Sequence, residues 1–218
     1  MSKPDSKRLV QTLLKNYGQT FTEELGRGMV RNMPSDLFCL LIASLLLSAR
    51  IRHTTGLEAC RLMLARGWTT PEALAKTTWR DRVEVLDDAG YVRYDERTST
   101  MLGDAVKLLL ERYQGDLRKL RDAAKADPAR ERELLKEFKG IGDVGADIFC
   151  REAQLAWPEL FPFADAKVLE GAKSLGLPAS ADQLLHLVRG RVEFVRLVAA
   201  LIRVKLRKNQ EEVLARAA

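Results

Sequence analysis

The strongest constraint on the fold of this chain is a glycine-rich hexapeptide, GIGDVG, at residues 140–145. Its spacing, G-x-G-x-x-G, binds dinucleotides only where it follows a β-strand and opens a helix. The preceding residues, DPARERELLKEFK, instead predict a helix. Asp127 is a favourable N-cap, Pro128 suits the first helical position, and the apolar residues that follow recur at helical spacing. The hexapeptide therefore predicts a helix-hairpin-helix over residues 128–155 and not a dinucleotide site.

Helix signals recur along the rest of the chain, and no segment has a convincing strand pattern. The longest apolar run, residues 37–49, contains Ser44 and Ser48 and is too short to span a bilayer, so it predicts a buried core helix. The N-terminal segment MSKPDSKR lacks the apolar region of a signal peptide. We therefore expect an all-α protein of about ten helices, located in the cytoplasm.

The cysteine and histidine content limits the chemistry of the chain. Cys39, Cys60 and Cys150 are far apart, and each lies in an apolar helical stretch. His53 and His186 are the only histidines. A disulfide framework, a metal knuckle and a Ser/His/Asp triad are therefore all disfavoured, and we expect buried thiols in a reducing compartment.

Positive charge is concentrated near the C-terminus of a chain whose net charge is +6. Between Arg189 and Lys208 there are seven basic residues and a single carboxylate, Glu193. Such a stripe predicts electrostatic attraction of DNA phosphates, with Arg203 and Lys205 as contacts. A solvated helix face explains the stripe equally well.

The glycines of the hairpin predict an anion site. Gly140 and Gly142 permit a left-handed backbone and a close approach to another molecule, and the following helix begins with exposed N–H groups. A nucleic-acid phosphate suits such a site without any base being read. We therefore expect Gly140, Gly142 and Gly145 to bind DNA, the alternative being a turn that needs glycine only for tight packing.

Four segments together resemble the helix-hairpin-helix DNA glycosylases, the superfamily that includes endonuclease III. LLKEFKGIGDVGADIF and FPFADAKVLEGAKSLGLP resemble its hairpin and downstream aspartate, SDLFCLLIASLLLSARI its groove-entering helix, and DAGYVRYDERT its G-x-Y-x-x-K-A loop. The matches keep their order over about two thirds of the chain. The resemblance implies two α-helical lobes with a groove between them: a central lobe of residues 31–157, and a second lobe of residues 1–30 and 158–218.

The resemblance also implies roles for individual residues. Asp165 matches the catalytic aspartate, which stabilises an oxocarbenium-like sugar; the alternative is a plain helix N-cap. Arg50 matches the residue that fills the gap left by the flipped base. Tyr91 matches the residue that wedges into the duplex, with Arg93 and Tyr94 close behind it. Tyr91 and Tyr94 are equally well explained as partly buried aromatics at a helix junction.

The chain also departs from the family pattern. Val144 stands where members with lyase activity carry a Schiff-base lysine, although Lys139 and Lys167 are nearby in sequence. No cysteine follows Cys150, so we expect no iron-sulfur cluster. The backbone oxygens that match the family's monovalent-cation site are those of Lys136, Phe138 and Ile141.

These patterns predict a monomeric, monofunctional DNA glycosylase that acts on double-stranded DNA containing a damaged or mismatched base. One alternative is a helix-hairpin-helix protein that binds distorted DNA without chemistry, which Val144, Asp143 and the missing cluster favour. The other is a glycosylase with lyase activity through a displaced lysine. No motif identifies the base that is removed.

Overall fold

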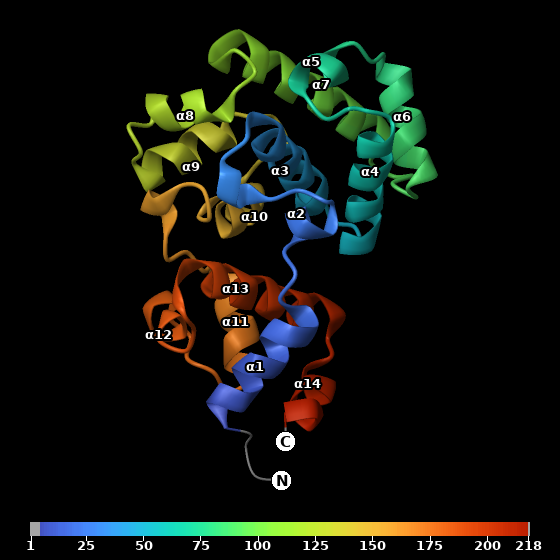
Figure 1. Ribbon diagram of the computed structural model, residues 1–218. Coiled ribbons are helices and arrows are strands. Elements are labelled where there is room, and N and C mark those ends of the chain that lie inside the picture. The colour runs from blue at the N-terminus through green and yellow to red at the C-terminus, as the bar shows by residue number, and fades with distance from the viewer. Residues whose placement is uncertain (1–4, 218) are drawn as a thin grey trace.

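The protein consists of two helical lobes, one above the other in Figure 1. The computed structural model describes residues 5–217, and all regular structure within that range is helical, which confirms the predicted all-α fold. The central lobe contains α2 (Phe21–Glu24), α3 (Pro34–Ser48), α4 (His53–Ala65), α5 (Pro71–Ala75), α6 (Trp79–Asp88), α7 (Asp95–Tyr113), α8 (Leu117–Ala123), α9 (Pro128–Lys136) and α10 (Asp143–Ala153). The second lobe contains α1 (Ser6–Tyr17), α11 (Ala166–Ser174), α12 (Ala181–Leu185), α13 (Gly190–Arg207) and α14 (Gln210–Ala217). The connectors contain two short 3-10 helices, η1 (Met29–Arg31) and η2 (Pro158–Leu160).

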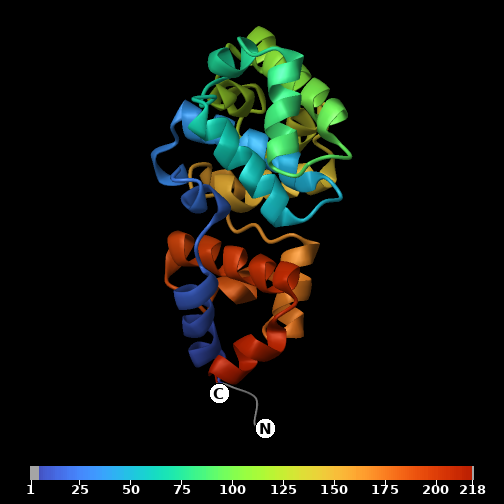
Figure 2. The ribbon, with the colours of Figure 1, turned by 90° about the vertical axis from the view of Figure 1, so that its right-hand side faces the viewer.

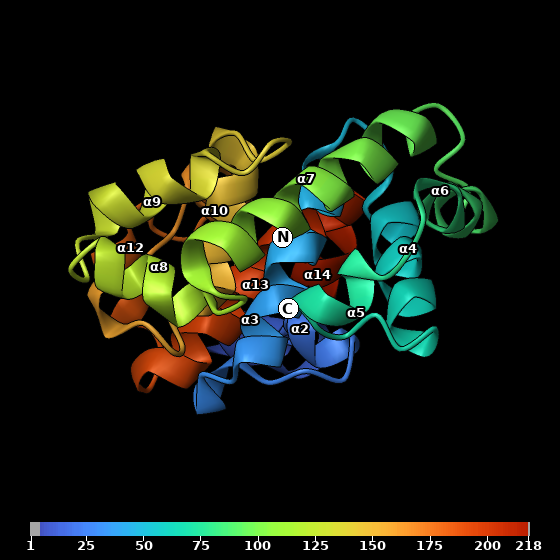
Figure 3. The same cartoon turned by 90° about the horizontal axis from the view of Figure 1, so that it is seen from above.

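Helix α3 forms the centre of the central lobe. All of its residues from Leu37 to Leu46 are buried, as expected of a helix that is apolar on every side. It packs against α4 and α10, and Figure 3 shows it between the α4–α6 side and the α8–α10 side of the lobe. The predicted core helix is thus confirmed. Among residues 5–217, no helix combines the length and the apolar composition needed to cross a membrane.

Helix α13 forms the centre of the second lobe, where α1, α11 and α12 pack around it. The contact with α11 is close at Gly171, because a Cβ on this residue would lie 2.8 Å from the carbonyl oxygen of Leu201. Helix α13 also contacts α10, so it forms the face of the second lobe that meets the central lobe. Some side chains of α13 can therefore contact the central lobe instead of solvent.

The lobes are joined by two chain segments, one between α1 and α2 and the other between α10 and α11 (Figure 2). Glu152 of α10 fixes the first of these segments. Its carboxylate accepts hydrogen bonds from the backbone N–H groups of Phe21 (2.7 Å) and Thr22 (2.9 Å) and from the Thr22 hydroxyl. The start of α2 is thereby tied to the central lobe.

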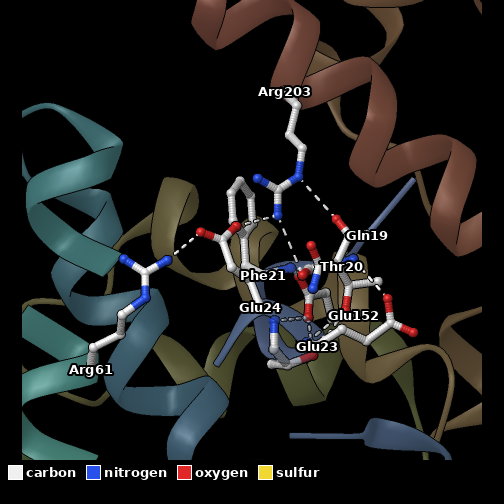
Figure 4. Close-up of polar contacts among 9 residues, drawn as sticks. Gln19, Thr20, Phe21, Glu23, Glu24, Arg61, Glu152 and Arg203 are labelled. Atoms are coloured by element: carbon white, nitrogen blue, oxygen red, sulfur yellow. Dashed lines mark hydrogen bonds and ion pairs between the residues drawn. The ribbon is translucent and has the colours of Figure 1, made fainter. Parts of the chain in front are cut away.

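Arg203 of α13 holds the same segment from the other side, as Figure 4 shows. Its Nε donates to the carbonyl oxygen of Gln19 (2.9 Å), and its Nη2 pairs with Glu24 (2.7 Å). Its guanidinium also lies 4.5 Å from the centre of the Phe21 ring. Residues 19–24 therefore contact both lobes, and the predicted lobe boundary at residue 30 lies just beyond a segment that belongs to the interface.

Candidate nucleic-acid interface and active site

The predicted helix-hairpin-helix is present as α9, a tight turn and α10. Gly140 has φ +95°, a left-handed backbone that favours glycine, and a Cβ there would lie 2.8 Å from the sulfur of Met101. Gly142 is the N-cap of α10 and is exposed, and a Cβ there would meet no atom within 4 Å. The open side of Gly142 therefore faces the place where an anion could approach the first N–H groups of α10.

Gly145 lies where α10 packs against α3. It is buried in the first turn of α10, and a Cβ on it would lie 3.1 Å from Ile141 and 3.6 Å from the carbonyl oxygen of Ser44. The absence of a side chain lets α10 pack closely on α3. The structure thus supports the alternative of a glycine needed for tight packing, and a DNA contact through the backbone of Gly145 stays a prediction.

A cavity of about 670 Å³ lies beside the hairpin. The end of α3 and the start of α7 form its other walls, and four basic residues line it: Arg50, Arg97, Lys136 and Lys139. Two of these cations already pair with carboxylates, Lys136 with Asp143 at 3.2 Å and Lys139 with Asp104 at 3.0 Å. Asp143 thus pairs with a neighbouring lysine.

The loop before α7 corrects the predicted wedge residue. Tyr91 is 1% exposed, and its hydroxyl donates to the carbonyl oxygen of Leu46 at 2.7 Å, so it belongs to the core. Val92 is 68% exposed and Arg93 is also exposed, while Tyr94 is 37% exposed and lines the cavity. For Tyr91 the structure supports the alternative of a buried aromatic at a helix junction. The exposed apolar side chain next to it is Val92.

A second cavity, of about 410 Å³, lies between the lobes. Its walls come from α2, the end of α3, the α3–α4 connector, the start of α4, α10, α11 and α13. Arg50, Ser48 and Ala49 line both cavities, so the two open beside each other. The second cavity is lined by Phe21, Leu47, Ser48, Ala49, Arg50, Ile51, His53, Val144, Ile148, Arg151, Lys167, Ile202 and Leu206.

Asp165 lies behind the wall of this interlobe cavity. It is the N-cap of α11, and its Oδ1 accepts a hydrogen bond from the N–H of Lys167 at 2.9 Å. Its Oδ2 forms a buried ion pair with Arg151, a residue that lines the cavity. Burial alone would raise the pKa of Asp165, but the Arg151 guanidinium and the backbone N–H groups hold it below its usual value. The carboxylate is therefore ionised at neutral pH. The predicted cap is confirmed, and the catalytic role stays a prediction.

Residues on one face of α10 frame the cavity beside Asp165. Val144, Ile148 and Arg151 follow at spacings of four and three residues, which places them on the same side of the helix. Val144 is 44% exposed and lines the cavity, so the position that the resemblance matched to a Schiff-base lysine does face it. Arg151 was missed from the sequence, although its spacing from Val144 was a usable signal.

The basic stripe of α13 is partly neutralised within the protein, because three of its seven basic residues, Arg196, Arg203 and Lys205, pair with carboxylates. Arg203 is 5% exposed and bonds to the segment before α2, so it is a structural cation and does not contact DNA. Lys205 pairs with Glu170 at 3.1 Å, and Arg196 pairs with Glu23 at 2.7 Å. Arg203 is the one buried residue among these seven, because its position lies on the inner face of a central helix. A DNA contact through Lys205 stays a prediction.

The three cysteines are buried thiols, as predicted. Burial raises the pKa of Cys39 and of Cys150 to about 12 and raises that of Cys60 as well, so none is a thiolate at neutral pH. Within residues 5–217, no group of three or more His, Cys, Asp or Glu side chains could hold a metal ion.

The expected monovalent-cation site at the hairpin uses carbonyl oxygens only. The carbonyl of Phe138 accepts a hydrogen bond from the N–H of Ile141 at 2.9 Å, and it keeps a second lone pair. The carbonyls of Lys136 and Ile141 belong to the same turn. The cation site stays a prediction.

The comparisons with known proteins concern the fold. No family model and no curated protein matches this chain. A solved structure of a trapped endonuclease III–DNA covalent intermediate matches with a TM-score of 0.50 and 18% identity, over 77% of this chain and 73% of that one. The Helicobacter pylori 3-methyladenine DNA glycosylase MagIII, bound to 1,N6-ethenoadenine, matches with a TM-score of 0.54 and 16% identity, over 95% of this chain and 98% of that one. The chain therefore has the two-lobed helical fold of these DNA glycosylases, as the resemblance implied.

Proposed function

We propose that this protein is a DNA glycosylase of base-excision repair, which hydrolyses the N-glycosidic bond of a damaged or mismatched base. The observation that carries the proposal is the ionised, buried Asp165 behind the wall of an interlobe cavity. The helix-hairpin-helix beside that cavity supplies a site for a phosphate, and the likeness in fold to two DNA glycosylases supports the same function.

The two cavities suit a flipped nucleotide. DNA phosphates would lie against Gly142 and the basic residues of the first cavity, while the flipped base enters the interlobe cavity. Val92 and Tyr94 would contact the duplex where the base leaves it, and Arg50, which lines both cavities, would fill the space left behind.

The Asp165–Arg151 pair suits the charge separation of the reaction. As the C1′–N bond breaks, the sugar becomes cationic and the electron pair moves to the base. Asp165 stabilises the sugar cation, and the Arg151 guanidinium on the cavity wall stabilises charge on the leaving base. Water then adds to C1′, and the proton it loses neutralises the base. The product is an abasic site in an unbroken strand.

A panel of labelled duplexes, each with one altered base, tests the proposal. Treatment with hot alkali breaks a strand only at an abasic site, so we expect cleavage after alkali and none before it. Strand breakage without alkali would instead favour a glycosylase with lyase activity, for which Lys167 on the cavity wall is the candidate amine. Binding without any abasic product would favour the non-catalytic alternative.

A lysine at position 144 should create covalent chemistry that the native protein lacks. Val144 faces the interlobe cavity, and a lysine amine there could form a Schiff base with the sugar. Borohydride should trap a protein–DNA adduct with Val144→Lys and none with the native protein. Val192→Lys is the control, since Val192 is similarly exposed (50%) but does not line the cavity. A robust adduct with the native protein would refute the monofunctional assignment.

Gly142→Ala should weaken DNA binding without unfolding the protein. The backbone of Gly142 has φ −99°, which alanine adopts, and a methyl group would point into open space where the phosphate is expected. We expect affinity to fall about tenfold and stability by at most about 1 kcal/mol. The control is Gly28→Ala, at another exposed N-cap whose Cβ would also meet no atom. Equal affinities of the two variants would contradict the placement of DNA at the hairpin.

Removal of Arg151 should shift the pH dependence of excision. In the native protein the pKa of Asp165 lies below its usual value, so this carboxyl imposes no acid limb in the neutral range, and the stability it contributes is lost only as pH falls through that lowered pKa. In Arg151→Met, burial should raise the pKa of Asp165 above its usual value. The acid limb of the excision rate should then move to higher pH, and the stability of the variant should fall as pH rises through the raised pKa. Rate profiles and melting curves measure both effects. Arg132→Met, which breaks a pair with Asp147 away from the cavity, should leave the profile unchanged.

A further inference from the structure

The side chains that line the interlobe cavity include basic residues but no carboxylate, whereas a cationic ligand would need negative charge. Three permanently charged or basic side chains line it, Arg50, Arg151 and Lys167, and no carboxylate does. The nearest carboxylate of the site, Asp165, lies behind Arg151 and is already paired with it. Because Asp165 offsets the charge of Arg151, a positively charged base entering this cavity would be repelled mainly by Arg50 and Lys167.

The aromatic residues that line the cavity also give a cationic base little attraction. Phe21 is the only Phe, Tyr or Trp among the residues that line it. A cationic base would be attracted to the electron-rich face of such a ring, but the Arg203 guanidinium already lies 4.5 Å from the centre of the Phe21 ring (Figure 4). His53 is the other ring in the lining. Burial and the nearby Arg207 and Arg203 lower its pKa, so its imidazole is neutral and adds no charge to the cavity wall.

The reaction itself distinguishes two classes of base. A neutral base leaves with the electron pair of the C1′–N bond and is therefore anionic until it gains a proton. A base that is already cationic because it is alkylated on a ring nitrogen leaves as a neutral molecule. Cations on the cavity wall stabilise the first kind of leaving group and give no such help to the second.

From these charges we infer that the cavity selects neutral bases that carry carbonyl oxygens, such as deaminated or oxidised bases, over cationic N-alkylated purines. The inference rests on the proposed glycosylase function and names its substrate class. The carbonyl oxygens accept hydrogen bonds from Arg50, Arg151 or Lys167, and the same side chains stabilise the departing anion.

Binding and excision measured on the same lesions test the inference. The binding arm uses duplexes with uracil, hypoxanthine or 7-methylguanine on a 2′-fluorinated sugar, which resists cleavage. Uracil or hypoxanthine should raise affinity about tenfold over an undamaged duplex, and 7-methylguanine should give no gain. Tighter binding of 7-methylguanine than of both neutral bases would overturn the inference.

A charge reversal inside the cavity makes the test specific. Lys167→Glu should shift the ratio of neutral to cationic lesion affinity about tenfold towards 7-methylguanine. The ratio cancels any general loss of phosphate contacts. Lys173→Glu is the matched control, because it makes the same change at an exposed position further along α11 and should leave the ratio unchanged. An unchanged ratio in Lys167→Glu would also overturn the inference.

The excision arm separates this inference from the proposed function. Excision of 7-methylguanine in preference to uracil and hypoxanthine would support a glycosylase and overturn the selection by charge. Selective binding of the neutral lesions without excision of any base would support the selection and refute the glycosylase.

Discussion

Replacing Asp165 by asparagine should reduce the rate of base excision roughly a hundred- to a thousandfold while duplex binding survives. Asparagine keeps the shape of the side chain and an oxygen that can accept from the N–H of Lys167, so helix α11 keeps its cap. What is lost is the negative charge beside the developing sugar cation. Single-turnover kinetics and duplex affinity, measured on the same variant, separate the two effects.

The buried pair with Arg151 calls for a second variant. Asp165→Asn leaves the guanidinium without its partner, and a broken buried pair costs about 3 to 5 kcal/mol. The double variant Asp165→Asn/Arg151→Met removes both charges and should be more stable than the single one, yet equally unable to excise a base. Excision near the native rate in a folded Asp165→Asn protein would mean that Asp165 is only a cap.

Arg203→Leu should destabilise the protein by about 3 kcal/mol, which lowers Tm by roughly 6 to 12 °C. The substitution removes the bonds to Gln19 and Glu24 that hold the segment before α2 against α13. It also leaves the carbonyl oxygen of Gln19 without this donor at the lobe interface. Thermal or denaturant unfolding measures the loss.

Lys205→Leu is the matched control for Arg203→Leu. Lys205 lies two residues further along α13, and its pair with Glu170 is partly exposed, so its loss should cost less than about 1 kcal/mol. If the two variants were equally stable, the interface role of Arg203 would be refuted. Loss of DNA affinity without loss of stability in Arg203→Leu would restore the phosphate contact expected from the sequence.

The parts of the fold that depend on local signals could be predicted from the sequence. The caps and glycines around GIGDVG are short-range features, and they correctly predicted α9, the turn and α10. The apolar run that became α3 was equally clear, because a helix without a polar face must be buried. The two-lobed arrangement came from the family resemblance, since no local signal states how helices pack.

The parts of the site that depend on tertiary contacts could not be predicted in the same way. Asp165 was identified as a cap from its neighbours, but its partner Arg151 lies on another helix. Tyrosine and arginine are residue types that often contact DNA at a protein surface. Only the tertiary packing shows that Tyr91 and Arg203 are both buried. Conversely, Val92 carries no motif of its own and stands out through its exposure alone.

Detection of the released base is the most direct measurement of the proposed function. A duplex with one uracil or hypoxanthine, incubated with the native protein, should yield the free base and an intact strand whose mass corresponds to an abasic site. The same incubation with Asp165→Asn should yield roughly a hundredth or less of that product in the same time. Tight binding of the duplex with no change in the mass of either strand, across neutral and alkylated bases alike, would contradict the assignment as a glycosylase.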